Sequence, residues 1–244
     1  MRFNKFKKIS HSYPALSIEN FLSPTQCKKI INQINTKKKF DIVSIHNRKM
    51  LIKGYPEFKK LLNKSKDLFR LLRYLNNKKT FNYILNLFQK NKNFIDHKHE
   101  IKFFDKNHFT KHNIIKGRKF IKNKRKTLYL DLDISVGGNN YHRGPHRDKP
   151  NRVIVFLIYL NTTPPNNGGE LELLNLKRKS YIHKKNLNYK HFQIKKIKPK
   201  AGKMIIFYSN KYSFHSVAKY IEKKGKKRFF MYGSFSLKNE RIWS

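Results

Sequence analysis

Residues 128–236 alternate between short apolar runs and polar turns, at intervals typical of β-strands. Positions 128–134 alternate apolar and polar side chains, and positions 153–160 form an uninterrupted apolar run. Alternation predicts a strand with one buried face, and a continuous run predicts a strand buried on both faces. Further strands are expected at residues 170–176, 192–197, 203–208 and 228–235, between turns rich in Pro, Asn and Gly. Many short strands of this kind predict an antiparallel sandwich or barrel.

The first part of the chain shows helical spacing instead. Ser23, Pro24 and Gln26 have the types expected at the N-cap, first-turn and capping-box positions of a helix. The apolar face of this helix follows at intervals of three and four residues: Cys27, Ile30, Ile31 and Ile34. Two more helical segments are expected, over residues 56–72 and 81–88. These helices carry no catalytic constellation, so we expect them to pack on the outside of a β domain.

His146 and Asp148 are the candidate chemistry at the centre of the chain. They are two residues apart, and in an extended strand such residues face the same side. We expect them at the mouth of a β-hairpin within residues 129–161. One imidazole and one carboxylate are two thirds of the facial triad that binds Fe(II) in non-haem oxygenases. A lone H-x-D is frequent by chance, so a third ligand is required.

His215 is the candidate third ligand, because it follows the strand expected at 203–208 and a barrel could bring it to the H-x-D pair. A triad on one side of iron leaves positions for a chelating 2-oxo acid and for O2. The distal carboxylate of such an acid needs a cation, and arginine grips a carboxylate with two N–H groups. Arg228 begins the last strand and is the candidate anchor, with Lys226 and Lys227 as alternatives.

Other histidines lie in a lysine-rich stretch at residues 89–126: His97, His99, His108 and His112. His97 and His99 could form a metal pair, but no carboxylate or third histidine is placed to complete a site. The simpler interpretation is solvated histidines on a basic loop.

The composition adds an extreme charge, with 57 Lys and Arg against 14 Asp and Glu and a formal net charge of +43. This charge attracts polyanions non-specifically, whether it serves a function or reflects a chain-wide compositional bias. The same two interpretations apply to four basic residues around the candidate ligands, which could steer an acidic substrate: Arg143, Arg147, Lys149 and Arg152.

A single cysteine, Cys27, excludes an intrachain disulfide and a thiolate metal cluster, and it fits a reducing compartment. The sequence has no signal-peptide pattern and no apolar run long enough to cross a membrane. We therefore expect a cytoplasmic location.

An ordered set of motifs runs through the second half of the chain: H-x-D at 146–148, Tyr159-Leu160-Asn161, Gly168-Gly169-Glu170-Leu171, Pro199-x-Ala201-Gly202, His215-Ser216-Val217 and Arg228. This set resembles the 2-oxoglutarate/Fe(II)-dependent oxygenase superfamily, and most of all its prolyl 4-hydroxylase-like branch. Residues 13–34, with Ile18-Glu19-Asn20-Phe21-Leu22-Ser23, are similar to the leading segment of that branch.

The resemblance implies a double-stranded β-helix (jelly-roll) core, in a fold that is mainly β with N-terminal helices (α+β). It implies iron bound by His146, Asp148 and His215, and the distal carboxylate of 2-oxoglutarate bound by Arg228. Fe(II), O2 and 2-oxoglutarate would then hydroxylate an unactivated C–H bond and release succinate and CO2, with ascorbate as a candidate reductant. We expect a basic arm at residues 1–12 and one domain at 13–244, with helical support at 13–126 and the core at 127–244.

The substrate stays open at this level. A prolyl residue of a protein is the family-level expectation, and amino acids, glycans and lipids are alternatives. A nucleic-acid demethylase is disfavoured, because Ser234 stands where that branch has a second arginine. Ser135 and Val136 also stand where family members often have a tyrosine near the cosubstrate. The rival from another class is a catalytically silent jelly roll that binds nucleic acid or another polyanion through its basic surface.

Overall fold

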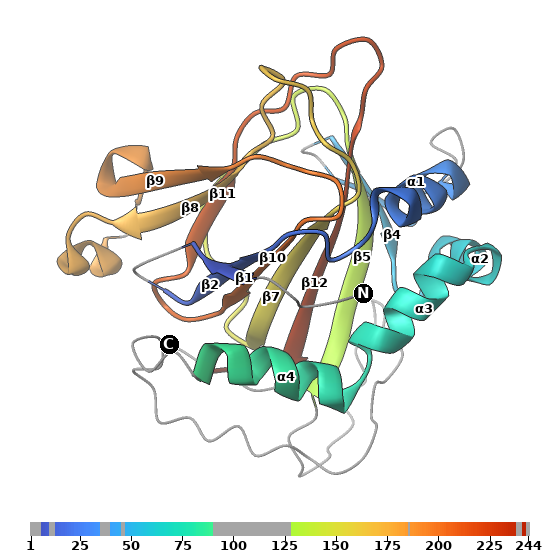
Figure 1. Ribbon diagram of the computed structural model, residues 1–244. Helices are drawn as coiled ribbons and strands as arrows, with labels where there is room; N and C mark the ends of the chain where they lie inside the picture. The colour runs from blue at the N-terminus through green and yellow to red at the C-terminus, as the bar shows by residue number, and fades with distance from the viewer. Residues whose placement is uncertain are drawn as a thin grey trace.

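Two antiparallel β-sheets lie face to face at the centre of the molecule (Figure 1). The computed structural model describes residues 6–9, 13–34, 40–44, 47–89, 128–184, 186–237 and 241–242. The larger sheet contains, in spatial order, β1 (Phe6–Lys8), β2 (Ala15–Ile18), β10 (Met204–Tyr208), β7 (Arg152–Tyr159), β12 (Arg228–Leu237), β5 (Leu128–Gly137), β4 (Arg48–Ile52) and β3 (Ile42–Ser44). The smaller sheet contains β6 (Arg143–His146), β11 (Phe214–Val217), β8 (Leu171–Leu176) and β9 (Phe192–Ile197).

The connections between β5 and β12 pass from one sheet to the other at every step except β8 to β9. Strands β5, β7, β10 and β12 therefore face β6, β8, β9 and β11. This connectivity is that of a jelly roll, so the expected core is confirmed. Strands β1 to β4 extend the larger sheet at both of its edges.

Strand β7 is buried on both faces, as its continuous apolar run predicts. Phe156 and Ile158 belong to the core between the larger sheet and the helices, whereas Leu157 and Tyr159 belong to the core between the two sheets. Successive side chains of a strand point to opposite faces, so one strand serves two cores.

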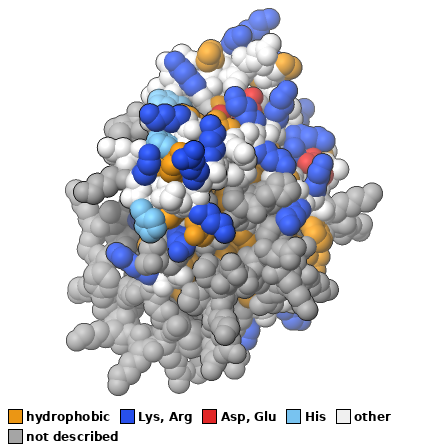
Figure 2. Space-filling view, turned by 90° about the vertical axis from the view of Figure 1, so that its left-hand side faces the viewer, with side chains coloured by type: hydrophobic (Ala, Val, Ile, Leu, Met, Phe, Trp, Pro, Cys, Tyr) orange, Lys and Arg blue, Asp and Glu red, His pale blue; other side chains and the backbone are white. Residues whose placement is uncertain are grey.

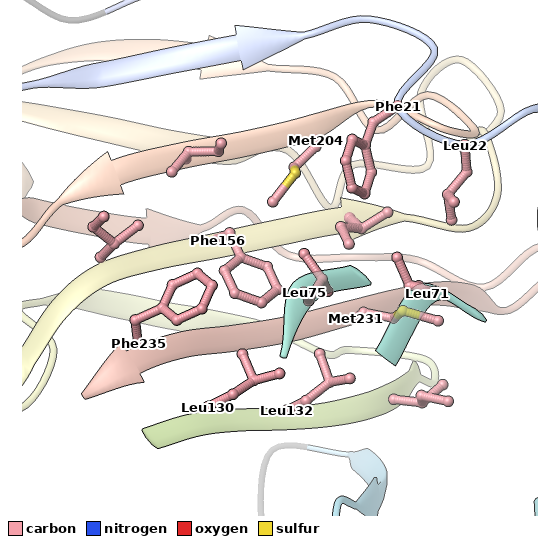
Figure 3. Close-up of a cluster of buried hydrophobic side chains, with 14 of the residues drawn as sticks. Phe21, Leu22, Leu71, Leu75, Leu130, Leu132, Phe156, Met204, Met231 and Phe235 are labelled. Atoms are coloured by element: carbon pink, nitrogen blue, oxygen red, sulfur yellow. The ribbon is translucent and has the colours of Figure 1, made fainter. Parts of the chain in front are cut away.

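The helices α3 (Lys66–Leu75) and α4 (Lys78–Gln89) cover the outer face of the larger sheet (Figure 1). Figure 3 shows Leu75 of α3 beside Phe156 of β7, and Leu71 of α3 beside Met231 of β12. The Phe81 ring of α4 meets the Phe235 ring edge-on, with centroids 4.9 Å apart. The helical segment therefore supports the sheet from behind, as expected.

Helix α1 (Pro24–Gln33) begins as the sequence predicts, because Ser23 and Gln26 form a reciprocal capping box. The helical segment expected at 56–72 is two helices instead, α2 (Pro56–Lys64) and α3. Ser65 separates them: it ends α2, and its Oγ accepts a hydrogen bond from the Leu68 backbone N–H at 3.2 Å. A serine hydroxyl that caps a new helix competes with continuation of the old one.

Two expectations are corrected. Residues 143–146 and 152–159 do not form a β-hairpin, because β6 lies in the smaller sheet and β7 in the larger one. The stretch expected to be helical support also contributes β3 and β4 to the larger sheet, and Phe6–Lys8 of the expected basic arm pairs with β2.

The expected loop histidines, His97, His99, His108 and His112, lie outside the described residues. None of the helices that the structure describes has both the length and the hydrophobicity needed to cross a membrane.

The packing of α4 on the sheet predicts that Phe81→Ala lowers the free energy of unfolding by about 3–5 kcal/mol, because a fully buried ring leaves a cavity. Urea denaturation followed by circular dichroism measures the change. Phe69→Ala is the matched control, because Phe69 is 47% exposed, and we expect it to cost less than about 1 kcal/mol. Equal losses for the two variants would contradict the docking of α4 through Phe81.

Candidate metal centre

The pairing of β6 with β11 places His146 directly opposite His215. Their ring centroids are 4.2 Å apart. Asp148 follows β6 by two residues, in the segment that leads to β7, and its Oδ2 lies 3.5 Å from His215 Nε2. One potential ligand atom from each of the three residues falls within 4.8 Å of the others. The structure therefore brings together the three side chains that the sequence singled out.

Backbone carbonyls orient both imidazoles. His146 Nδ1 lies 2.8 Å from the Gly144 carbonyl oxygen, and His215 Nδ1 lies 3.2 Å from that of Ser213. A carbonyl only accepts hydrogen bonds, so each Nδ1 carries the proton and each Nε2 keeps a free lone pair. This arrangement is typical of histidines that bind a metal through Nε2.

Burial lowers the pKa of His146 to about 2, and the neighbouring His215 and Arg143 add to the shift. Burial also lowers the pKa of His215, although Asp148 opposes that change. Both imidazoles are therefore neutral at pH 7, which is the form that binds a metal.

The Asp148 carboxylate is held at one oxygen only. Its Oδ1 accepts hydrogen bonds from the Tyr232 hydroxyl and from Arg152 Nη1, the latter at 2.7 Å, while its Oδ2 is buried and has no hydrogen-bond partner in the described structure. Burial alone would raise the pKa of this carboxyl, but His215, Arg152 and the hydrogen bond from Tyr232 together hold it below its ordinary value. Asp148 is therefore ionised, with Oδ2 turned toward the histidines.

These donors fit a divalent metal ion. His146 Nε2 and Asp148 Oδ2 are buried atoms without a hydrogen-bond partner among the residues that the structure describes. Such atoms are costly in a protein interior unless a ligand or water satisfies them. Two imidazole nitrogens and one carboxylate oxygen form the donor set that suits Fe(II) with further positions left open.

Arg228 lies on the same side of β12 as Phe230 and Tyr232, between the two sheets, and its side chain is fully buried. Its Nε donates to the Gly169 carbonyl oxygen at 3.0 Å, while Nη1 and Nη2 have no partner in the described part of the chain. The guanidinium carbon lies 4.2 Å from the Phe230 ring centroid. Two buried N–H-bearing nitrogens in aromatic surroundings can receive a carboxylate bidentately.

Gly169 is required for this arrangement. Its φ is +78°, and a Cβ at this position would meet the Arg228 Cδ at 2.9 Å. The second glycine of the motif at 168–171 therefore leaves room for the Arg228 side chain.

The alternative anchors for the cosubstrate carboxylate, Lys226 and Lys227, do not lie in the interior between the sheets. Lys226 is exposed and Lys227 is partly exposed, so neither is enclosed as Arg228 is. Three of the four basic residues near the ligands differ in where their side chains lie. Arg152 points inward to Asp148, whereas Lys149 is exposed and Arg147 lies over the Phe214 ring at 4.9 Å. Elsewhere, Lys and Arg side chains dominate the described part of the face shown in Figure 2.

Three residues of the site were missed or misjudged from sequence. Tyr159 of β7 points between the sheets, and its buried hydroxyl has no described partner near Arg228, whose Cζ is 5.5 Å from the Tyr159 ring centroid. Tyr232 and Arg152 hold Asp148. Tyr232 was recognisable only as an alternation partner of Arg228, and Arg152 only as one basic residue among many.

The comparison with protein families matches residues 132–235 to the 2OG-Fe(II) oxygenase superfamily. No curated protein matches the chain. Among solved structures, the prolyl 4-hydroxylases from Phytophthora capsici align with a TM-score of 0.56 and 12% identity, over 93% of this chain and 59% of theirs. The non-haem α-ketoglutarate-dependent epimerase SnoN from nogalamycin biosynthesis aligns with a TM-score of 0.52 and 9% identity, over 91% of this chain and 76% of its own.

The viral collagen prolyl hydroxylase from Paramecium bursaria Chlorella virus-1, in its 2OG complex, has a TM-score of 0.48 and 15% identity, over 91% of this chain and 94% of its own. Because these sequence identities are low, the structures with TM-scores above 0.5 support the fold assignment and nothing more. The segment that matches the 2OG-Fe(II) oxygenase superfamily contains all three converging residues and Arg228, and this family implies Fe(II), 2-oxoglutarate and O2.

Proposed function

We propose that the chain is a hydroxylase in which His146, Asp148 and His215 bind Fe(II) and Arg228 binds the distal carboxylate of 2-oxoglutarate. The observation that carries this proposal is the convergence of three ligand atoms within 4.8 Å, with His146 Nε2 and Asp148 Oδ2 buried and unpartnered in the described structure. A divalent cation would satisfy both atoms at once. The neutral histidines and the ionised aspartate are already in the protonation states that a metal requires.

The anchor for 2-oxoglutarate is argued from charge. Arg228 is fully buried, and the described structure contains no carboxylate paired with it. A buried charge without a counter-charge is costly, so a ligand carboxylate at Nη1 and Nη2 would stabilise it. Burial raises the pKa of Tyr159 to about 12, with Arg228 opposing the rise, so the phenol stays protonated and can donate a third hydrogen bond.

Iron, O2 and 2-oxoglutarate, when bound, supply the oxidation that converts a C–H bond into C–OH and 2-oxoglutarate into succinate and CO2. The protein residues hold and orient these groups. Arg152 and Tyr232 fix Asp148 Oδ1, so that only Oδ2 is turned toward the two histidines. The aromatic interior formed by Tyr141, Phe230 and their neighbours keeps bulk water away from the anchor.

We propose a prolyl residue of a peptide as the substrate. The support is the sequence resemblance of residues 13–34 and 128–236 to the prolyl 4-hydroxylase-like branch. The jelly roll does not decide between substrates, because a hydroxylase from Phytophthora capsici and the SnoN epimerase share the fold. No observation favours the alternative of a silent polyanion-binding protein. We also propose that residues 13–244 form one domain.

Asp148→Ala should abolish the metal site. Anaerobic titration of the wild type with Fe(II) and 2-oxoglutarate should produce the weak visible charge-transfer band of a chelated iron complex. The variant should lack this band and bind Fe(II) more than about 100-fold more weakly, because loss of a ligand exceeds the usual effect of a residue that only supports one. Asp67→Ala, which removes a partly exposed carboxylate in the first turn of α3, should behave like the wild type. A band that persists in Asp148→Ala would remove Asp148 from the ligand set.

Arg228→Gln should weaken 2-oxoglutarate specifically. We expect the Kd of 2-oxoglutarate to rise about 30-fold or more, since a buried charge pair loses one partner, while Fe(II) affinity stays unchanged. The same titration measures both constants. Lys226→Gln and Lys227→Gln remove a cation close to Arg228 in sequence and should leave the Kd unchanged. If one of them reproduces the loss and Arg228→Gln does not, the anchor is that lysine.

Proline-containing peptides should gain one oxygen atom when incubated with the wild type, Fe(II), 2-oxoglutarate and air. Mass spectrometry of the peptide and quantification of succinate should give equal amounts of hydroxylated product and succinate. Asp148→Ala should give neither product. Succinate without any peptide product would rule out the prolyl substrate while leaving the oxygenase chemistry in place.

A further inference from the structure

Arg48 reaches into the space between the two sheets from outside the eight strands of the jelly roll. It is the first residue of β4, where it pairs with Gly137 at the end of β5. Its guanidinium carbon lies 5.2 Å from the Phe230 ring centroid and 5.5 Å from that of Tyr232. Both rings belong to the core between the sheets. Arg48 therefore lies along the same row of β12 side chains as the proposed cofactor residues.

The guanidinium of Arg48 is held in place by β5. Its Nε donates to Ser135 Oγ at 2.7 Å, and its Nη2 donates to both carboxylate oxygens of Asp133, at 2.7 and 2.9 Å. The Ser135 hydroxyl in turn donates to Asp133 Oδ1 at 2.5 Å. A network with so many shared partners fixes the orientation of the side chain.

One guanidinium nitrogen is left over. Arg48 Nη1 has no hydrogen-bond partner among the described residues, and the side chain keeps 13% exposure, so this donor is not sealed from solvent. The neighbouring Tyr232 donates its hydroxyl to Asp148 Oδ1. A donor therefore lies one aromatic side chain away from a proposed iron ligand, in a fixed position, with nothing described to receive its hydrogen bond.

The charges around Arg48 determine which kind of hydrogen-bond acceptor Nη1 prefers. Asp133 lies at 2.7 Å and neutralises the guanidinium, so the pair has no net charge. A second carboxylate at Nη1 would be repelled by Asp133, whereas a neutral carbonyl oxygen gains the hydrogen bond without that penalty. Arg228 differs, because it has no described counter-charge and is suited to the cosubstrate carboxylate.

We propose that Arg48 Nη1 determines substrate specificity by donating a hydrogen bond to a neutral carbonyl oxygen of the primary substrate, of the kind that a peptide backbone carries. This inference rests on the proposed function, because it places a peptide beside the iron. It assigns Arg48 to substrate binding and gives it no part in binding iron or 2-oxoglutarate.

The test measures peptide binding without turnover. A fluorescein-labelled, amide-capped decapeptide of alternating Pro and Ala is titrated with the anaerobic Fe(II) and 2-oxoglutarate complex, and anisotropy reports the Kd. About 0.3 M NaCl screens the general attraction of the basic surface. We expect Arg48→Gln to raise the peptide Kd about tenfold or more, because a hydrogen bond from a charged donor is lost. The charge-transfer band and the Kd of 2-oxoglutarate should not change.

Three further variants separate recognition from a structural role. Arg70→Gln removes the same charge from an exposed position on α3 and should leave peptide binding unchanged. Arg48→Lys keeps the charge but lacks the fork of donors, and it should weaken the peptide almost as much as Arg48→Gln. Asp133→Asn makes the pair cationic, so it should improve binding of a matched Pro-Glu peptide relative to the Pro-Ala peptide. A purely structural Arg48 would not produce that change in preference.

The outcomes are distinct. Unchanged peptide binding in Arg48→Gln overturns the inference and leaves the proposed function standing. Loss of 2-oxoglutarate binding in the same variant also overturns it, because Arg48 would then belong to the cosubstrate site. A wild type that shows the band but binds no Pro-Ala peptide overturns both the inference and the peptide substrate. A wild type that shows no band overturns the oxygenase function itself.

Discussion

The pairing of β6 with β11 is the constraint on which the candidate metal centre depends. The hydrogen-bonded ladder sets His146 opposite His215 and brings their ring centroids to 4.2 Å. Asp148 leaves the end of β6, so the strand that positions one imidazole also delivers the carboxylate. Tyr232 then reaches Asp148 from the larger sheet. The carboxylate is held from both sheets, so the geometry of the site is a property of the whole sandwich and would be lost if the sheets separated.

The interior charges follow from the same arrangement. Arg48 and Arg152 each face an aspartate, Asp133 and Asp148, at 2.7 Å. Arg228 is buried with them between the sheets, and the described residues offer it no counter-charge. A protein interior tolerates an unpaired guanidinium poorly, so this imbalance supports the proposal that Arg228 receives an anionic ligand. In a chain with a net charge of +43, the informative arginine is thus the buried one without a partner, because surface cations are common to the whole molecule.

Much of the fold could be predicted, because strands and helix caps have characteristic patterns over a few consecutive residues. The run that became β7 shows burial on both faces, and Ser23 and Gln26 form the expected capping box. Contacts between sheets have no local pattern. The hairpin prediction was wrong because strands that change sheets have the same alternation as strands that turn back. For the same reason Tyr159 was not recognised as a site residue and Arg48 was not considered. Each of them lies at the site because of contacts with residues that are distant in sequence.

Arg48 comes from a different part of the chain than the residues proposed to bind iron and 2-oxoglutarate. His146, Asp148, His215 and Arg228 all lie within the segment that matches the oxygenase family, residues 132–235, whereas Arg48 lies outside it on β4, between β5 and β3 in the larger sheet. Cofactor residues must keep one geometry, which here depends on the pairing of β6 with β11 and on the hydrogen bonds that Arg152 and Tyr232 donate to Asp148. Substrate contacts must differ between enzymes that share this chemistry, and β4 pairs only with β5 and β3, so it is separate from the pairing of β6 with β11 that brings the histidines together. Where a tyrosine is common beside the cosubstrate in the family, this chain has Ser135, whose hydroxyl helps to fix Arg48. The serine that departs from the family pattern on β5 therefore belongs to the hydrogen-bond network that orients the arginine on β4.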